Sequence, residues 1–204
     1  MNGLEALDLE TESIGEVPLS HGQRALWFLD LLAPGNAAYV VAGAVRVRAG
    51  LDPEALRRCL RALTARHAAL RTVFREEDGG PVALVRAAQE PDFTLVPAAE
   101  SAGSDGEELA RRLTDFAYRG FDLEHGPLVR LGLFERPEGP LMVLALHHIV
   151  SDFWSLGLLV RELGALYSQE TGGAPADLAP LDLTYGDWVR AQEERLAGPE
   201  GERL

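Results

Sequence analysis

The sequence contains 204 residues, of which 47% are apolar and 25% are charged, and this fits one globular domain with a sizeable core. The net charge is −13 and there is no lysine, so the chain lacks the large basic surface that nucleic-acid binding requires. Cys59 is the only cysteine, which excludes an intrachain disulfide, and no apolar run reaches the roughly 20 residues of a membrane span.

Residues 1–17 form an acidic leader without the basic and apolar regions of a secretory signal, so we expect a cytoplasmic protein. Beyond the leader, leucines recur near helical spacing up to Pro34, and apolar residues then alternate as in a strand. Asp52 before Pro53 is typical of a helix start, and the Asp-Gly-Gly sequence at 78–80 indicates a hairpin turn. These patterns predict, in chain order, a helix over 19–32, a strand over 39–47, a helix over 52–67 and two strands flanking 78–80.

The second half of the chain continues the mixture of strands and helices. A short strand is expected first, followed by a small polar loop and a helix whose acidic first turn suits the helix dipole. Two apolar strands and a further helix follow, and a proline-rich joint at 174–180 precedes the last helix. The predicted ranges are 93–96 (strand), 98–106 (loop), 107–119 (helix), 128–134 and 141–147 (strands), 155–172 (helix) and 181–196 (helix). This order predicts an α/β fold with a mixed sheet.

Two adjacent histidines, His147 and His148, stand at the end of the second apolar strand. Consecutive side chains of a strand point to opposite faces, so the two rings cannot both enter one small site. This argues against a metal site made by the pair. We therefore expect one ring to face a cleft while the other packs beneath it and fixes the strand end.

Asp152 follows the histidines just before the next helix. Its carboxylate can cap that helix or form a buried ion pair that fixes the turn, and the sequence leaves both roles open. The candidate partners for an ion pair are Arg24, Arg66 and Arg71.

Five stretches of the sequence resemble, in order, the motifs of the condensation domains of nonribosomal peptide synthetases. The histidines belong to HHIVSDFWS, which is similar to the family signature of two histidines, three variable residues, Asp, Gly, a variable residue and Ser. The other four stretches are LSHGQRALWFL, RHAALRTVF, FDLEHGPLVRLGLF and YGDWVRAQ. The resemblance covers the chain from about Pro18 onward, and domains of this family are much longer than this chain.

The resemblance implies the chloramphenicol acetyltransferase-like fold, in which two similar lobes form a V around a tunnel. Residues 18–173 would form the N-terminal lobe, and residues 174–204 would form the joint and the helix leading to a C-terminal lobe that this chain lacks. The implied partners are donor and acceptor carrier proteins, which present their substrates on phosphopantetheine arms, and no metal or cofactor of the domain itself is implied. The reaction would be amide formation, and we expect the chain alone to be inactive because the tunnel needs both lobes.

By the same resemblance His148 is the catalytic residue, with His147 and Asp152 in supporting positions. A neutral imidazole can accept a proton from the attacking ammonium or hold the amine in line for attack, and the sequence does not separate these roles.

The sequence departs from the family pattern at two positions. Ala25 stands where the opening motif usually has arginine, and Phe153 replaces the glycine of the histidine motif. The Phe153 ring either narrows the tunnel or packs against its own lobe. The substrate-channel candidates are therefore Phe153, Trp154 and Ser155.

Two other functions compete with condensation. An epimerisation domain carries similar histidines, and a non-catalytic docking module would recruit partner enzymes. The opening motif favours condensation over epimerisation. The presence of both histidines and Asp152 argues against a docking module.

Overall fold

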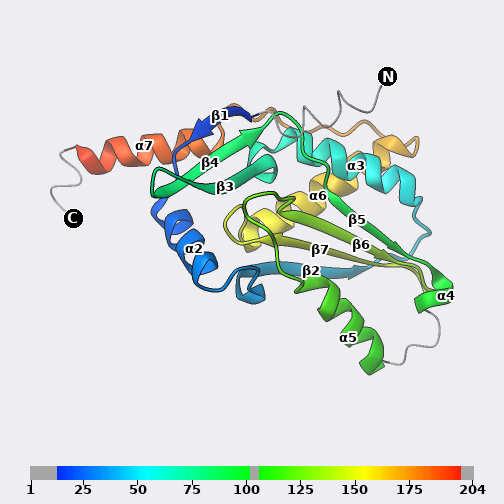
Figure 1. Cartoon of the computed structure of the whole chain (residues 1–204). Coiled ribbons are helices and arrows are strands. Elements are labelled where there is room, and N and C mark those ends of the chain that lie inside the picture. Colours follow the sequence, from blue (N-terminus) through cyan, green and yellow to red (C-terminus); the bar gives the residue numbers. More distant parts are fainter. Residues whose placement is uncertain (1–12, 102–105, 199–204) are drawn as a thin grey trace, which may run out of the picture.

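The computed structural model describes residues 13–101 and 106–198 and contains two β-sheets (Figure 1). The smaller sheet has three antiparallel strands in the order β1-β4-β3, which are β1 (Ser13–Val17), β4 (Gly80–Arg86) and β3 (Thr72–Glu77). The larger sheet has four strands in the order β2-β7-β6-β5, which are β2 (Val40–Arg46), β7 (Leu141–His147), β6 (Val129–Phe134) and β5 (Asp92–Val96). Its β5 and β6 are parallel and its other pairs antiparallel, so the predicted mixed sheet is confirmed.

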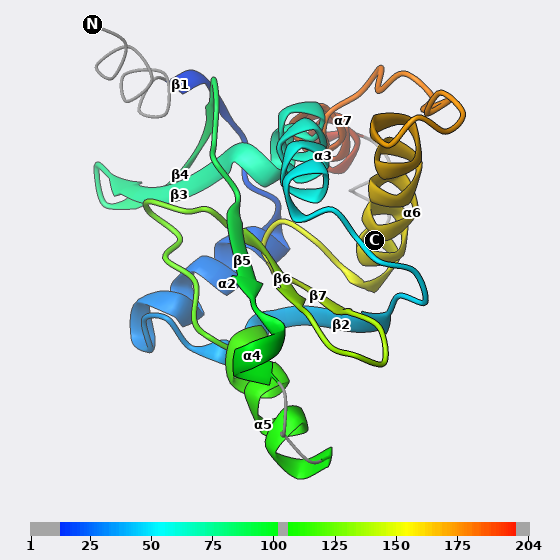
Figure 2. The same ribbon diagram turned by 90° about the vertical axis from the view of Figure 1, so that its right-hand side faces the viewer.

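Helices cover both faces of the larger sheet (Figures 1 and 2). The side chains of Met142, Leu144 and Leu146 on β7 share a cluster with α3 and α6, whereas Leu141 and Val143 pack with α5 on the opposite face. This alternation follows from the period of two along a strand and explains why β7 is apolar throughout. The helices are α2 (His21–Leu32), α3 (Pro53–Arg66), α4 (Ala98–Ser101), α5 (Gly106–Ala117), α6 (Phe153–Glu170) and α7 (Tyr185–Ala197), with 3-10 turns at Ala37–Tyr39 and Ala68–Arg71.

Helix α3 shows how the sequence sets an element that supports the site. It begins where predicted, because the Asp52 side chain accepts a hydrogen bond from the Glu54 amide at 2.9 Å and Pro53 occupies the first turn. One stripe of the helix is buried against the larger sheet and α6, and Cys59 within it is 3% exposed. The stripe consists of Ala55, Leu56, Cys59, Leu60, Leu63 and Thr64.

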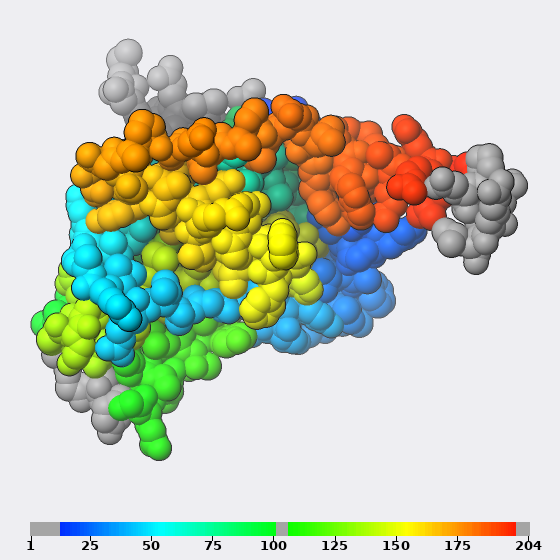
Figure 3. Space-filling model, turned by 180° about the vertical axis from the view of Figure 1, so that it is seen from behind, coloured from blue at the N-terminus to red at the C-terminus, as the bar shows by residue number. Residues whose placement is uncertain are grey.

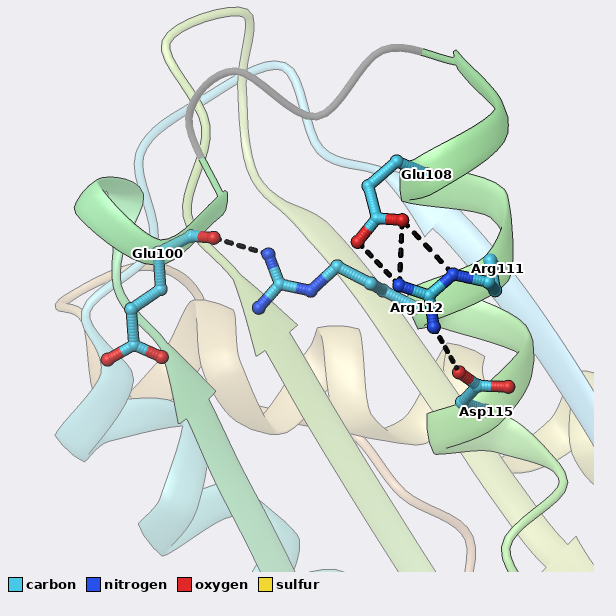
Figure 4. A network of polar contacts seen from close by, with 5 residues as sticks. All are labelled: Glu100, Glu108, Arg111, Arg112 and Asp115. Atoms are coloured by element: carbon cyan, nitrogen blue, oxygen red, sulfur yellow. Dashed lines mark hydrogen bonds and ion pairs between the residues drawn. The ribbon is translucent and has the colours of Figure 1, made fainter.

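Charged side chains of α4 and α5 form a surface network (Figure 4). Arg111 donates to Glu108 at 2.7 Å and to Asp115 at 3.2 Å within α5, and Arg112 donates to the main-chain oxygen of Glu100 on α4. Exposed pairs of this kind contribute little stability, so the packing of α5 rests on its apolar face.

The structure differs from the predicted boundaries at two places. Ser13–Val17 lie within the predicted leader but form β1, which pairs with β4, so the lobe begins before residue 18. Four of the five residues of β1 are exposed, and the strand therefore leaves no apolar alternation in the sequence. The predicted loop over 98–106 begins with α4, and residues 1–12 and 102–105 lie outside the described part of the chain.

The segment after α6 runs along that helix and leads to α7 at the surface (Figure 3). Helix α7 has a capping box between Thr184 and Asp187 and buries Val189. The Tyr185 hydroxyl donates to the Ser20 hydroxyl at 3.0 Å, which ties α7 to the start of α2. Among the helices described, none is long and apolar enough to cross a membrane.

Candidate active site

A tight turn links the end of β7 to the start of α6 and carries both histidines. His147 is the last residue of β7 and pairs with Val40 of β2, and the His148 amide donates to the Tyr39 oxygen at 2.7 Å. Asp152 then caps α6. The turn is therefore anchored on a central strand at one end and on a helix at the other.

The ring of His147 lies in the core, where it is 2% exposed. Its Nδ1 accepts a hydrogen bond from the Ile149 amide at 3.1 Å, and its edge meets the Phe121 ring with centroids 6.2 Å apart. Burial, together with the adjacent His148, lowers the pKa of His147 to about 4, which keeps the imidazole neutral at pH 7. This ring supports the turn from the core side and is closed to solvent.

His148 is exposed, so the two rings occupy the opposite environments that the strand pattern predicts. Its Nδ1 lies 2.6 Å from the main-chain oxygen of Ser151. Because a carbonyl oxygen only accepts, Nδ1 carries the hydrogen, and Nε2 of the neutral ring holds a free lone pair. The ring is thus oriented to accept a proton or a hydrogen bond at Nε2.

Asp152 is the cap of α6 and has no ion-pair partner among the described residues. Its Oδ1 accepts from the Ser155 amide at 2.7 Å and from the Ser155 hydroxyl at 2.6 Å. These hydrogen bonds hold the pKa of Asp152 below its usual value. The start of a helix also favours a negative charge, so this exposed carboxylate is satisfied without a cation.

Of the two roles that the sequence left open for Asp152, the structure shows the helix cap, and the alternative of an ion pair with Arg24, Arg66 or Arg71 is wrong for this structure. Arg66 pairs instead with the buried Glu162 on α6, with 3.1 Å between Nε and Oε2. Arg71 donates to main-chain oxygens at the end of β4, and Arg24 is exposed on α2.

Replacing Asp152 with alanine is expected to lower the free energy of unfolding by about 0.5–2 kcal/mol, the usual cost of losing a helix cap. Loss of a buried ion pair would cost about 3–5 kcal/mol. Asp152→Asn is the matched control, because asparagine caps as well as aspartate, and we expect it to remain close to the unmodified chain. Urea denaturation of the three proteins measures the difference. A loss of ion-pair size in Asp152→Ala would restore the rejected pairing.

The predicted substrate-channel residues occupy the first turn of α6. Phe153 and Trp154 are 78% and 86% exposed, so neither ring packs against its own lobe. Ser155 is half-buried and its hydroxyl is held by Asp152. Two large aromatic side chains thus stand free beside the His148 turn.

Two further residues of this region did not emerge from the sequence. Gln23 on α2 donates to the Ile149 oxygen at 3.0 Å, and Glu162 on α6 binds both Arg66 and His67. The spacing of Ser20 and Gln23, which matches a capping box, could have drawn attention to Gln23. The position of Glu162 among the buried leucines of α6 was the corresponding signal for a paired core carboxylate.

A cavity of about 690 Å³ lies between α2, β3 and the segment 120–124, and its lining does not include His148. Its lining includes Trp27, Phe74 and Phe121 with several carboxylates at Asp30, Asp122 and Glu124. The exposed histidine and its oriented nitrogen, rather than this cavity, define the candidate site. Within the described ranges, no group of three His, Cys, Asp or Glu side chains could hold a metal ion.

Known proteins similar to this chain are large peptide synthetases. Residues 13–203 match the family model of the condensation domain. A component of the linear gramicidin synthase of Brevibacillus parabrevis is 39% identical over 184 residues, which cover 89% of this chain and 2% of that protein. Phosphinothricin tripeptide synthetase PhsB of Streptomyces viridochromogenes is 38% identical over 199 residues, which cover 95% of this chain and 16% of that protein. The chain thus spans a small part of these relatives.

Solved structures share the fold over nearly the whole chain. The X-domain from teicoplanin biosynthesis, solved in complex with OxyB, is 28% identical with a TM-score of 0.77, covering 94% of this chain and 40% of that one. The first condensation domain of the calcium-dependent antibiotic synthetase is 22% identical with a TM-score of 0.80, covering 94% and 48%. An epimerization domain of tyrocidine synthetase B is 24% identical with a TM-score of 0.77, covering 94% and 44%. The chain therefore belongs to the condensation domain family of nonribosomal peptide synthetases and has the fold of its N-terminal, chloramphenicol acetyltransferase-like lobe.

Proposed function

We propose that this chain contributes the catalytic histidine to a domain that joins two carrier-bound substrates through an amide bond. The amine nitrogen of the acceptor attacks the thioester carbonyl carbon of the donor, the carbon–sulfur bond breaks, and the amine's proton ends on the departing thiol. Each substrate would arrive on the phosphopantetheine arm of a carrier protein. His148 would take up the proton at Nε2 or hold the amine in line through the same atom.

The orientation of the His148 ring carries this proposal. The bond from Nδ1 to the Ser151 oxygen selects the tautomer that leaves Nε2 as an acceptor, and the ring is exposed at the end of a central strand. His147 shows the contrasting case of a core histidine, because its ring is buried and its Nδ1 accepts from the Ile149 amide.

Exposed apolar side chains favour the proposal that a second lobe packs beside this one. Phe153 and Trp154 at the start of α6 are joined by Leu183, Tyr185 and Trp188 at the start of α7, with exposed fractions between 46% and 86%. Apolar surface of this kind marks an interaction site. We therefore propose that a C-terminal lobe covers this surface and completes the tunnel, and that the chain alone has no turnover.

A reconstitution assay tests the proposed function. A complete domain whose N-terminal lobe is this chain would be mixed with a donor acyl thioester on one carrier protein and an aminoacyl thioester on another. Mass spectrometry should detect the amide product on the acceptor carrier. Inversion of the substrate α-carbon without amide formation would indicate epimerisation instead, and failure of both reactions would favour a docking module. Turnover by the 204-residue chain alone would contradict the need for a second lobe.

Replacing Phe153 with glycine is expected to widen the range of donors that the complete domain accepts, because the exposed ring stands where the family has no side chain. Glycine in a helix also lowers the free energy of unfolding by about 0.5–1 kcal/mol, so the preference among donors must be measured separately from the total amount of product. Phe153→Ala is the matched control, since it removes the ring without adding backbone freedom. Competition among donor thioesters of increasing bulk at the α-carbon gives the preference profile. Identical profiles for all three proteins would remove Phe153 from the substrate channel.

A further inference from the structure

We infer that Gln23 positions the turn that carries His148, an inference that rests on the catalytic role proposed for that histidine. The side-chain Nε2 of Gln23 donates to the main-chain oxygen of Ile149 at 3.0 Å, across 126 residues of sequence. Gln23 and Ile149 are 8% and 3% exposed, so this bond is shielded from water. Because Ile149 directly follows His148, this hydrogen bond restrains the main chain of the turn one residue after the histidine.

The Gln23 amide is itself held in one orientation by the start of α2. Its Oε1 accepts from the Ser20 amide at 3.0 Å, and its own main-chain amide donates to the Ser20 hydroxyl at 3.2 Å. With Oε1 committed to a donor, the amino group is the end that faces Ile149. The capping box therefore has a second role besides starting α2, because it orients the Gln23 amino group toward the Ile149 oxygen.

The other side of the turn is held by His147. The Ile149 amide donates to His147 Nδ1 at 3.1 Å, and the Ser151 hydroxyl donates to the His147 oxygen at 3.2 Å. The main-chain amide and oxygen of Ile149 are thus fixed from two different elements. This arrangement leaves the Ser151 oxygen where it orients His148 at 2.6 Å.

Loss of the Gln23 donor would remove the hydrogen-bond partner of a buried carbonyl. Such a group is costly, and the turn can relieve the cost by rotating the Ile149 oxygen toward water. The Ser151 oxygen would move with the turn, and the His148 ring would lose the contact that sets its tautomer. Gln23 therefore acts on the reaction through His148 and does not touch substrate.

Two variants of the 204-residue chain separate this role from helix capping. Gln23→Glu keeps the oxygen that accepts from Ser20 but presents a second oxygen to the Ile149 carbonyl. Ser20→Ala removes a capping bond yet leaves the Gln23 side chain in place. Nuclear magnetic resonance of ¹⁵N-labelled histidines, recorded at alkaline pH where imidazoles are neutral, reads the His148 tautomer, and the signal is assigned by its loss in His148→Ala.

The Nδ1–H form should dominate at His148 in the unmodified chain. Its ratio to the Nε2–H form should fall about fivefold in Gln23→Glu, the factor that one neutral hydrogen bond supplies, and stay unchanged in Ser20→Ala. An unchanged ratio in Gln23→Glu, or an equal fall in Ser20→Ala, would overturn the inference. Should Gln23→Glu fail to fold, Gln23→Met removes the donor without adding a charge and is expected to give the same fall.

This test needs no substrate, so its outcome is independent of the reconstitution assay. If the tautomer ratio falls in Gln23→Glu but the complete domain forms no amide, the proposed function is refuted and the role of Gln23 in the turn stands. If the complete domain forms the amide but the tautomer ratio does not change in Gln23→Glu, the role of Gln23 is refuted and the proposed function stands.

Discussion

Replacing His148 with alanine in the complete domain is expected to lower the rate of amide formation by at least about 100-fold. General-base catalysis and alignment of the amine each supply factors of this size or larger, and either would use Nε2. The His148 ring is exposed, and the hydrogen bond that it makes within the protein goes to the Ser151 oxygen. The lobe should therefore stay folded when the ring is removed. Initial rates with saturating carrier-bound substrates, together with thermal melting of each protein, give the two quantities.

His125→Ala is the matched control for this variant. His125 is also a surface histidine, with a side chain 69% exposed and paired to Asp122 at 2.9 Å. It lies outside the His148 turn, and its removal should leave turnover near that of the unmodified domain. Near-normal turnover in His148→Ala would refute the catalytic assignment, and a collapse of both variants would indicate damage to the fold.

Replacing Glu162 with glutamine is expected to lower the free energy of unfolding by about 3 kcal/mol or more, which is the cost of breaking a buried ion pair from one side. Glu162 is 6% exposed and its Oε2 lies 3.1 Å from Arg66 Nε and 2.7 Å from His67 Nε2. Arg66 also donates to the main-chain oxygen of Ala179, so this cluster joins α3, α6 and the segment leading to α7. Urea denaturation of the chain at pH 7 measures the loss.

Glu170→Gln on the same helix is the matched control. Glu170 pairs with Arg58 at 2.6 Å, but both side chains are more than one-third exposed, and such pairs contribute about 0–1 kcal/mol. Losses of equal size in the two variants would contradict a special role for the buried cluster.

The contribution of Glu162 should also depend on pH. Burial opposes ionisation of the carboxyl, but the hydrogen bonds from His67 and Arg66 outweigh it and hold the pKa of Glu162 below its usual value. A group of this kind stabilises the folded state fully above its unfolded pKa, near 4.3 for glutamate, and loses that effect as the pH falls through its folded pKa. The stability difference between the unmodified chain and Glu162→Gln should therefore shrink as the pH falls below about 4. A difference that grows below about pH 4 would contradict the sign.

Local sequence patterns were sufficient to predict the strand that carries the histidines and the different environments of the two rings. The apolar residues of β7 and the period of two along a strand predicted that His147 and His148 would occupy different environments, and the structure buries the first and exposes the second. The order of the motifs predicted the family, and the strand and helix patterns predicted the mixed sheet. The environments of the two histidines and the type of each element depend on short stretches of chain, where backbone geometry fixes how neighbouring side chains lie. The family instead followed from the resemblance of motifs spread along nearly the whole chain.

Contacts between distant segments could not be predicted in this way. Asp152 caps the start of α6 and Glu162 lies in the middle of the same helix, and the choice of which carboxylate meets Arg66 depends on where the end of α3 packs. Gln23 reaches Ile149 only because α2 lies beside the end of β7. Strand β1 is held through its main chain, so its side chains carry no pattern that a sequence could reveal.

The burial of Cys59 gives the lobe a natural reporter of its own opening. The thiol is the only one in the sequence and lies 3% exposed between α3 and the larger sheet. Burial raises the pKa of the Cys59 thiol, so the reactive thiolate is scarce while the protein is folded. A maleimide must therefore wait until α3 separates from the sheet, and the labelling rate follows the frequency of that separation at one defined position. The rate at which the core opens can thus be measured at a native cysteine, without engineering a labelling site into the chain.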